Sequence, residues 1–189
     1  MSSLPQHRAL WRYALTDLTG LAFAALWGLR GLRGLGWAFP LDLTIIMVIS
    51  APLIWGFLAR DLSQGRPEII IDRALAQRVK RLRVLLLFLA GMTLSVLHRP
   101  DLMLVVFGLV IGASYIPLGR AMAEPVHGIT GLAILVVTLF ALMFPPPLHL
   151  ILAGLGTATS LWLGAAARLW GHSPASSGKT RVATAGETP

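Results

Sequence analysis

The chain of 189 residues contains no cysteine, and only 13% of its residues are charged. Without cysteine, it has no disulfides, no thiolate metal ligands and no cysteine nucleophile. Soluble domains carry about 25% charged residues, so a chain with so little charge and 56% hydrophobic residues requires lipid as part of its solvent. Only eight residues are acidic. A proton relay or cation path of several buried carboxylates is therefore not expected.

What the chain does have is a series of long apolar stretches between Leu15 and Ala167. A membrane helix needs about 17–25 mostly apolar residues. We expect six such helices, over residues 13–29, 41–59, 84–97, 102–119, 129–144 and 148–167. Three successive prolines, residues 145–147, end the fifth helix and force a tight turn. The sequence thus predicts an all-α fold, a polytopic membrane helical bundle with about six transmembrane helices.

The basic residues predict the orientation of this bundle. Thirteen of the 16 Lys and Arg residues fall on the side of the two termini, and three fall on the other side. Because cytoplasmic loops are enriched in Lys and Arg, residues 1–12 are expected to be a cytoplasmic N-terminus. Residues 169–189, which have almost no large apolar side chain, are expected to form a disordered cytoplasmic tail. Topology also explains the net charge of +8, so no nucleic-acid partner is expected.

The segment of residues 60–83 is the most basic part of the chain. Asp72 is a candidate helix cap. An apolar stripe at helical spacing follows it, made of Ile71, Leu75, Val79 and Leu82. The polar face carries candidate contacts for anionic lipid headgroups at Arg73, Arg78, Lys80, Arg81 and Arg83. We expect a cytoplasmic amphipathic helix that lies on the membrane surface before it turns into the third span. Its role is either to anchor and orient the chain or to bind an acidic partner.

Two of the predicted spans contain a proline, Pro52 and Pro117, and polar residues lie just before each. Proline frees a backbone carbonyl one turn earlier, and in a membrane that carbonyl must be satisfied by protein or cavity water. The prolines therefore predict either simple kinks or a polar midplane cavity at two broken helices. Asp17, near the start of the first span, is either a cap or a functional carboxylate. The candidate ligand-binding residues are Asp17, Ser50, Pro52, Ser114, Tyr115 and Pro117.

Acid and base side chains suggest two further sites near the membrane surfaces. On the outer side, His98, Asp101 and His149 offer a set of two histidines and one carboxylate, but without the spacing of a metal motif. On the inner side, Arg120, Glu124 and His127 share a short loop, in which Glu124 and His127 are a candidate acid and base. Isolated interfacial histidines and a surface ion cluster are the simpler interpretations. We therefore expect no metal and no cofactor.

Small residues recur at four-residue spacing in three spans. The rows are Gly20-Ala24-Gly28, Gly108-Gly112 and Gly156-Ser160-Gly164. Such rows let helix backbones approach closely where no hydrophobic effect drives association. They join helices either within one chain or between protomers, so a homo-oligomer or a partner membrane protein stays open.

A resemblance rests on three short stretches. Ala24-Ala25-Leu26-Trp27, Pro52 and Gly112-Ala113-Ser114-Tyr115-Ile116-Pro117 resemble small bacterial multi-pass membrane protein families of unknown function. The resemblance implies an integral membrane protein, in a bacterial inner membrane, and it carries over no catalytic residue. The leading hypothesis is a non-enzymatic, small-molecule- or lipid-binding or transport-related bundle. The alternatives are a membrane-embedded enzyme that acts on a lipid and an accessory or scaffold subunit of a membrane complex.

Overall fold

The computed structural model describes residues 4–64 and 70–170, with side chains described for residues 18–60 and 70–170. This part of the chain is all-helical, which confirms the predicted fold class. The elements are α1 (Leu4–Arg33), α2 (Phe39–Gln64), α3 (Arg73–Val96), the short 3₁₀ turn η1 (Pro100–Leu102), α4 (Met103–Ala121), α5 (Pro125–Ala141) and α6 (Leu148–Trp170). Most of the predicted tail, from residue 171 onward, lies outside the described residues.

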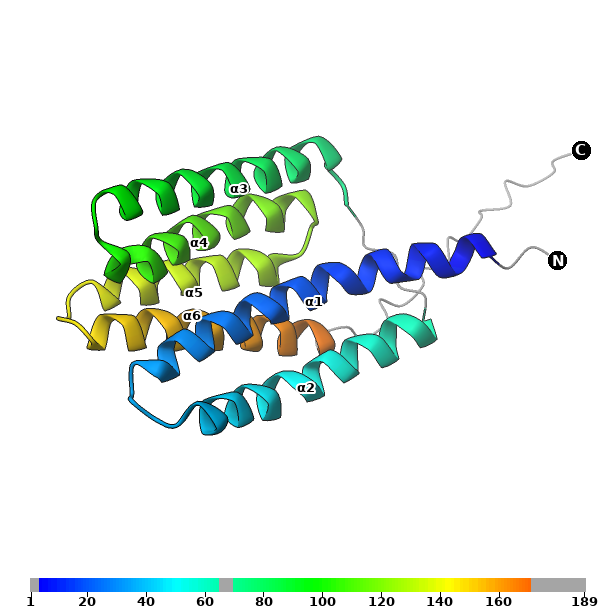
Figure 1. Cartoon of the computed structure of the whole chain (residues 1–189). Helices are drawn as coiled ribbons and strands as arrows, with labels where there is room; N and C mark the ends of the chain where they lie inside the picture. The colour runs from blue at the N-terminus through cyan, green and yellow to red at the C-terminus, as the bar shows by residue number, and fades with distance from the viewer. Residues whose placement is uncertain (1–3, 65–69, 171–189) are drawn as a thin grey trace, which may run out of the picture.

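Successive helices run in opposite directions, so α1 begins and α6 ends at the same end of the bundle (Figure 1). In the central layer, α4 packs on α5, α5 on α6, and α6 on α1. Helix α3 covers the outside of α4, and α2 packs on α1 and α6. The main core is shared by α1, α2, α4, α5 and α6, with buried side chains that include Ala24, Phe57, Ile111, Ile134 and Trp162.

Three described helices are long and apolar enough to cross a membrane. They cover Phe39–Arg60, Pro100–Ala121 and Leu148–Trp170, and the apolar helix Pro125–Ala141 is shorter. These helices are compatible with a membrane protein. The expected total of six spans stays a prediction, since the basic residues of α3 and the length of α5 place both outside this group.

Local signals account for several helix ends. The carboxylate of Asp72 accepts a hydrogen bond from the Leu75 amide at 2.8 Å, which confirms the predicted cap of α3. Helix α5 begins at Pro125, where a missing backbone N–H has no cost. The three prolines separate α5 from α6, as predicted. Pro52 and Pro117 lie inside α2 and α4, and both helices continue across them, so neither is a broken helix.

The amphipathic segment and the predicted third span form one helix, α3, with no turn between them. The expectation of a surface helix that turns into a separate span is therefore wrong. The predicted apolar stripe is divided between two surroundings. Leu75 and Val79 pack against the bundle beside the buried Ala76, whereas Ile71 and Leu82 are exposed. Packing against α4 decides the face of α3, because Ala76 meets Leu118 and its neighbours at the end of α4.

The rows of small residues pack against other helices of the same chain. A Cβ at Gly28 would meet side chains of α2 and α6, and a Cβ at Gly112 would lie 2.9 Å from the Gly131 carbonyl oxygen of α5. The closest approach of α1 and α6 uses another pair: a Cβ at Gly154 would lie 2.6 Å from the Cα of Gly31. Close intramolecular packing therefore accounts for these glycines.

Candidate functional site

A cavity of about 300 Å³ lies toward the end of the bundle at which α1 begins and α6 ends. All six helices contribute to its wall. Its apolar lining includes Leu21, Phe23, Phe57 and Leu161. Its polar lining consists of Thr19, Lys80, Arg83, Tyr115, His127, Thr130 and Arg168. This mixture of apolar wall and a few polar groups is typical of a small-molecule site.

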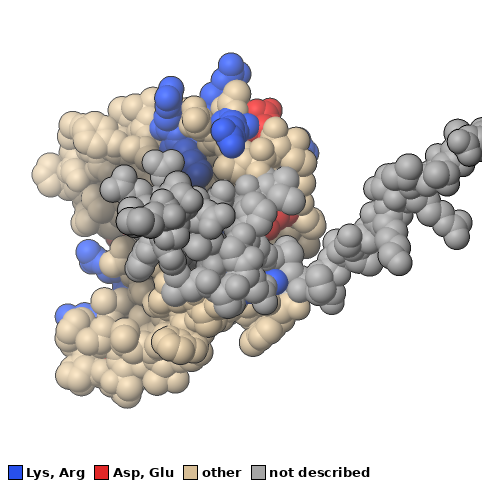
Figure 2. Space-filling view, turned by 90° about the vertical axis from the view of Figure 1, so that its right-hand side faces the viewer, with Lys and Arg blue, Asp and Glu red and all other residues tan. Residues whose placement is uncertain are grey.

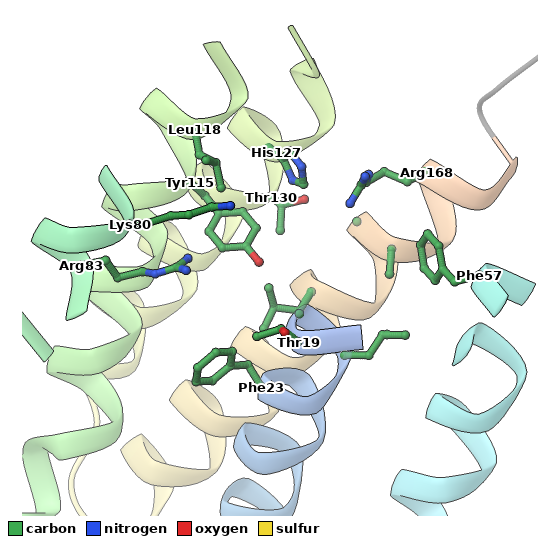
Figure 3. A pocket seen from close by; sticks show the side chains of 15 residues that line it. Thr19, Phe23, Phe57, Lys80, Arg83, Tyr115, Leu118, His127, Thr130 and Arg168 are labelled. Atoms are coloured by element: carbon green, nitrogen blue, oxygen red, sulfur yellow. The ribbon is translucent and has the colours of Figure 1, made fainter. Parts of the chain in front are cut away.

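Two of the predicted headgroup contacts, Lys80 and Arg83, line this cavity. They are three residues apart, so they share one face of α3, and both are half-buried. Figure 3 shows the two side chains on one wall, reaching toward Tyr115. Neither forms an ion pair with any residue whose side chain the structure describes. The cavity therefore has a wall with two positive charges.

The other three predicted headgroup contacts do not line the cavity. Arg73, Arg78 and Arg81 are exposed. Figure 2 looks onto this end of the bundle and shows Lys and Arg side chains gathered at the top, over α3. The basic residues of α3 thus fall into an inward pair and an outward group of three. The pair and the group carry the same sign of charge, but only the pair meets a confined space.

The opposite wall holds a buried ion pair between helix ends. Arg168 Nε, near the end of α6, lies 2.8 Å from Glu124 Oε2, just before α5. The side chain of Arg168 is 10% exposed and that of Glu124 is 23% exposed. Because the two charges neutralise each other, this wall carries hydrogen-bonding groups with little net charge.

His127 lies beside this ion pair. Its Nε2 is 3.5 Å from Glu124 Oε2, which is too long for a hydrogen bond, and it has no hydrogen-bond partner among the described groups. The ring of Tyr115 meets the His127 ring edge-on, with 5.6 Å between the centroids. Figure 3 shows His127 and Thr130 on the same wall, across the cavity from Lys80.

A second arginine fixes the helix end that carries Arg168. Arg60, on α2, donates hydrogen bonds from Nη1 to the carbonyl oxygens of Arg168, at 3.1 Å, and of Leu169. The last carbonyls of a helix have no partner within the helix, and a cation near them also complements the helix dipole. Arg60 thus caps α6 and positions the Arg168 side chain.

Of the predicted ligand-binding residues, Tyr115 lines the cavity. Ser50 is buried elsewhere and accepts a hydrogen bond from Trp162 Nε1 at 3.2 Å. Ser114 donates to the Ile111 carbonyl within α4, at 2.7 Å. Both serines therefore have structural partners.

The remaining members of the predicted set are not gathered around the cavity either. Pro52 is exposed and Pro117 is half-buried, and neither lines the cavity. The side chain of Asp17 lies outside the described side chains. The structure thus gathers residues from a different part of the sequence analysis, the basic segment, around Tyr115.

The outer histidines do not assemble into a metal site. His98 is exposed, and His149 Nε2 lies 3.2 Å from the backbone carbonyl oxygen of Asp101. The Asp101 carboxylate instead accepts two hydrogen bonds from Arg99, at 3.2 and 3.1 Å. The residues with described positions include no group of three or more potential metal ligands.

On the inner side, the cation that pairs with Glu124 is not the predicted one. Arg120 is exposed, whereas Arg168, which directly follows the predicted sixth span, pairs with Glu124. Thr19, Phe23 and Thr130 were also missed as cavity residues. One signal was available: the alternating topology places the start of the fifth helix and the end of the sixth on the same side.

Comparisons of the chain with protein-family models, with curated proteins and with solved structures found no match. The class of the protein therefore rests on its own architecture. It is an all-helical bundle, compatible with a membrane protein, with a basic cavity toward one end.

Proposed function

We propose that this chain is a multi-pass membrane protein that binds the acidic headgroup of an amphiphile in the basic cavity. The inward orientation of Lys80 and Arg83 carries the proposal. Two like charges on the packed face of a helix repel each other and lose part of their hydration. An anion bound between them offsets both costs and forms charge-assisted hydrogen bonds.

The depth of the two cations supports a headgroup as the anion. Lys80 and Arg83 lie seven and ten residues after the start of α3, which corresponds to about 10 and 15 Å along a helix. Beyond Arg83, α3 exposes a continuous apolar surface that includes Val84, Phe88 and Val96. The cations therefore lie where a polar segment meets an apolar one, the level at which acidic headgroups meet acyl chains.

Exposed apolar surface elsewhere supports the membrane location. Large side chains such as Val48 and Trp55 on α2, and Leu163 on α6, are more than 60% exposed. Soluble monomers rarely expose contiguous apolar patches larger than a few hundred Å², whereas lipid contact requires such a surface. A cytoplasmic position of both termini agrees with the common end at which α1 begins and α6 ends (Figure 1).

Glu124 is not favoured as a general base at this site. A general base needs a free carboxylate or imidazole within reach of the substrate. Glu124 is held by Arg168 at 2.8 Å, so its Oε2 is engaged in an ion pair. A ligand-binding or transport-related role uses the same groups without a proton transfer.

The test compares the inward and outward basic residues of one helix. The protein is purified in a neutral detergent and mixed with an anionic phospholipid, and the retained lipid is measured by native mass spectrometry. The double substitution Lys80→Gln/Arg83→Gln should lower retention by at least about tenfold, because it removes two charge-assisted contacts. The control Arg78→Gln/Arg81→Gln removes the same charge from exposed positions and should change retention little.

Equal losses in the two double variants would contradict the proposed cavity and indicate a nonspecific attraction of basic residues to anionic lipid. A zwitterionic phospholipid provides the second control. Wild-type protein should retain it less than the anionic lipid, and neither double variant should change its retention. Equal retention of both lipids by the wild type would also contradict the proposal.

A further inference from the structure

The cavity has two polar walls with different chemistry. Lys80 and Arg83 form a wall with net positive charge on α3. Across from it, Thr130, His127 and the ion pair of Arg168 with Glu124 form a wall whose charges balance. Figure 3 shows the Tyr115 ring lying between the two walls. A ligand that fills this space therefore meets cations on one side and neutral hydrogen-bonding groups on the other.

The wall whose charges balance contains a buried polar atom without a hydrogen-bond partner among the described residues. The side chain of His127 is 9% exposed, and its Nε2 has no hydrogen-bond partner in the described part of the chain. A buried polar atom without a partner is costly, so such atoms commonly mark the position of a water or a ligand group. The neighbouring Thr130 side chain also lines the cavity, and a hydroxyl can both donate and accept. A second anion is not favoured here, because the Glu124 carboxylate lies beside His127.

We infer that the ligand is an anionic lipid whose headgroup carries hydroxyl groups beyond its phosphate. The inference rests on the proposed function and adds the chemical class of the headgroup. The phosphate lies against Lys80 and Arg83, and a hydroxyl-bearing group crosses the cavity to His127 and Thr130. Hydroxyls suit this wall because they satisfy a histidine nitrogen in either of its roles, as donor or as acceptor.

The arrangement of the helices supports a lipid as the source of this headgroup. Helices α1 and α3 both line the cavity, but over the described residues they form no extended interface with each other. The cavity is therefore not closed by helix packing on that side. On the α1 side the lining residue Phe23 is followed one turn later by Leu26, which is exposed. Acyl chains can leave the cavity along this apolar path while the headgroup stays inside.

The experiment uses two lipids that differ only in hydroxyl groups. Phosphatidylglycerol and phosphatidylpropanol with the same acyl chains each carry one negative charge and a three-carbon headgroup, but only the first has headgroup hydroxyls. Both are offered together, in equal amounts, to the full chain in neutral detergent, and native mass spectrometry gives the ratio of the two bound species. Because the ratio is measured within one sample, a lower folded fraction in a variant does not change it.

Wild-type protein should favour phosphatidylglycerol by about two- to tenfold, the range expected for one or two neutral hydrogen bonds. Thr130→Val, which keeps the shape of the side chain, and His127→Phe, which keeps a ring against Tyr115, should each bring the ratio toward one. Lys80→Gln/Arg83→Gln should lower the binding of both lipids and leave the ratio unchanged. A wild-type ratio near one, or a ratio that neither Thr130→Val nor His127→Phe changes, would overturn the inference.

The failure of the inference is distinct from the failure of the proposed function. If the double basic variant loses both lipids but the wild type binds the two lipids equally, the cavity binds acidic headgroups without distinguishing those that carry hydroxyls. A final arm adds sn-glycerol 1-phosphate, the soluble headgroup without acyl chains, at the concentration of the lipid. It should not displace phosphatidylglycerol, and displacement would overturn the assignment of a lipid in favour of a soluble phosphate ester.

Discussion

Helices α1 and α6 meet backbone to backbone through glycines at one end of the bundle, and a cavity lined by charged side chains lies toward the other end. At the glycine end, where α1 ends and α6 begins, Gly31 and Gly154 bring two backbones together, so that an added Cβ would lie 2.6 Å from a backbone atom. At the cavity end, a Cβ at Gly20 on the same helix α1 would lie 3.7 Å from Tyr115 Oη, its nearest neighbour outside its own stretch of helix. There Arg168 and Glu124 bridge the helix ends.

The difference shows which end of this fold has space for a binding site. Backbones in direct contact leave no space for a ligand, and any atom added between them lowers the free energy of unfolding strongly. Long charged side chains span a wider gap, and the space beside them stays accessible. The stability of the glycine end and the binding properties of the cavity end can therefore be changed separately.

The largest effect is expected at the glycine end. Gly154→Ala places a methyl group against the backbone of Gly31, which cannot rotate away, so α1 and α6 must separate. We expect a loss of about 2–3 kcal/mol in the free energy of unfolding, as for overpacked cores, measured by reversible unfolding in mixed detergent micelles. Gly128→Ala is the matched control, since nothing lies within 4 Å of its added Cβ. A loss no larger than that of the control would show that the two helices are not held at this distance.

A smaller effect is expected at the cavity end. Arg168→Met keeps most of the length of the side chain but leaves the partly buried Glu124 carboxylate without this cation. The free energy of unfolding should fall by about 1–2 kcal/mol, less than for a fully buried pair, because Glu124 retains some contact with solvent. Arg120→Met, at an exposed position of the same end, should have little effect. Similar losses in both variants would argue against a specific ion pair.

The smallest effect is expected for the exposed pair at the glycine end. Arg99 and Asp101 form two hydrogen bonds, yet the Arg99 side chain is 56% exposed. Water and salt screen such pairs, so Arg99→Gln should leave the unfolding midpoint unchanged within error. A clear shift of the midpoint would mean that this pair, like the one at the cavity end, contributes to closing the bundle.

Sequence reasoning was most successful where local chemistry determines the structure. The Asp72 cap, the turn at residues 145–147 and the all-helical fold follow from neighbours in the chain. The basic segment was also identified as a candidate site, and it contains Lys80 and Arg83. Helical periodicity, however, predicted one apolar stripe facing the membrane, whereas Leu75 and Val79 of that stripe pack on the bundle and Ile71 and Leu82 are exposed. Apolar periodicity alone does not say whether a helix face meets protein or lipid, because the two environments are similarly apolar.

The rest of the site depends on contacts between distant segments. Arg168 and Glu124 are separated by 44 positions, and no local pattern marks them as a pair. Prolines and serines within apolar runs were predicted to bind a ligand. Ser114 instead donates a hydrogen bond to a carbonyl of its own helix, and Ser50 accepts one from Trp162. Such side chains have local or structural partners that a sequence does not reveal, so a polar residue in a span is a weaker guide than a charge on a packed face.

The contact of Arg60 with the end of α6 has a consequence for the order in which the chain assembles. It joins residues 108 positions apart, from the second helix to the last. The end of α6 is synthesised after the other described helices, so this cap is among the last contacts of the described bundle to form. Until then α1 and α2 lack their packing partner α6, which contacts both of them and α5. Helix α6 therefore completes the packing of the described bundle, and chains truncated before it should leave the faces of α1, α2 and α5 that contact α6 uncovered.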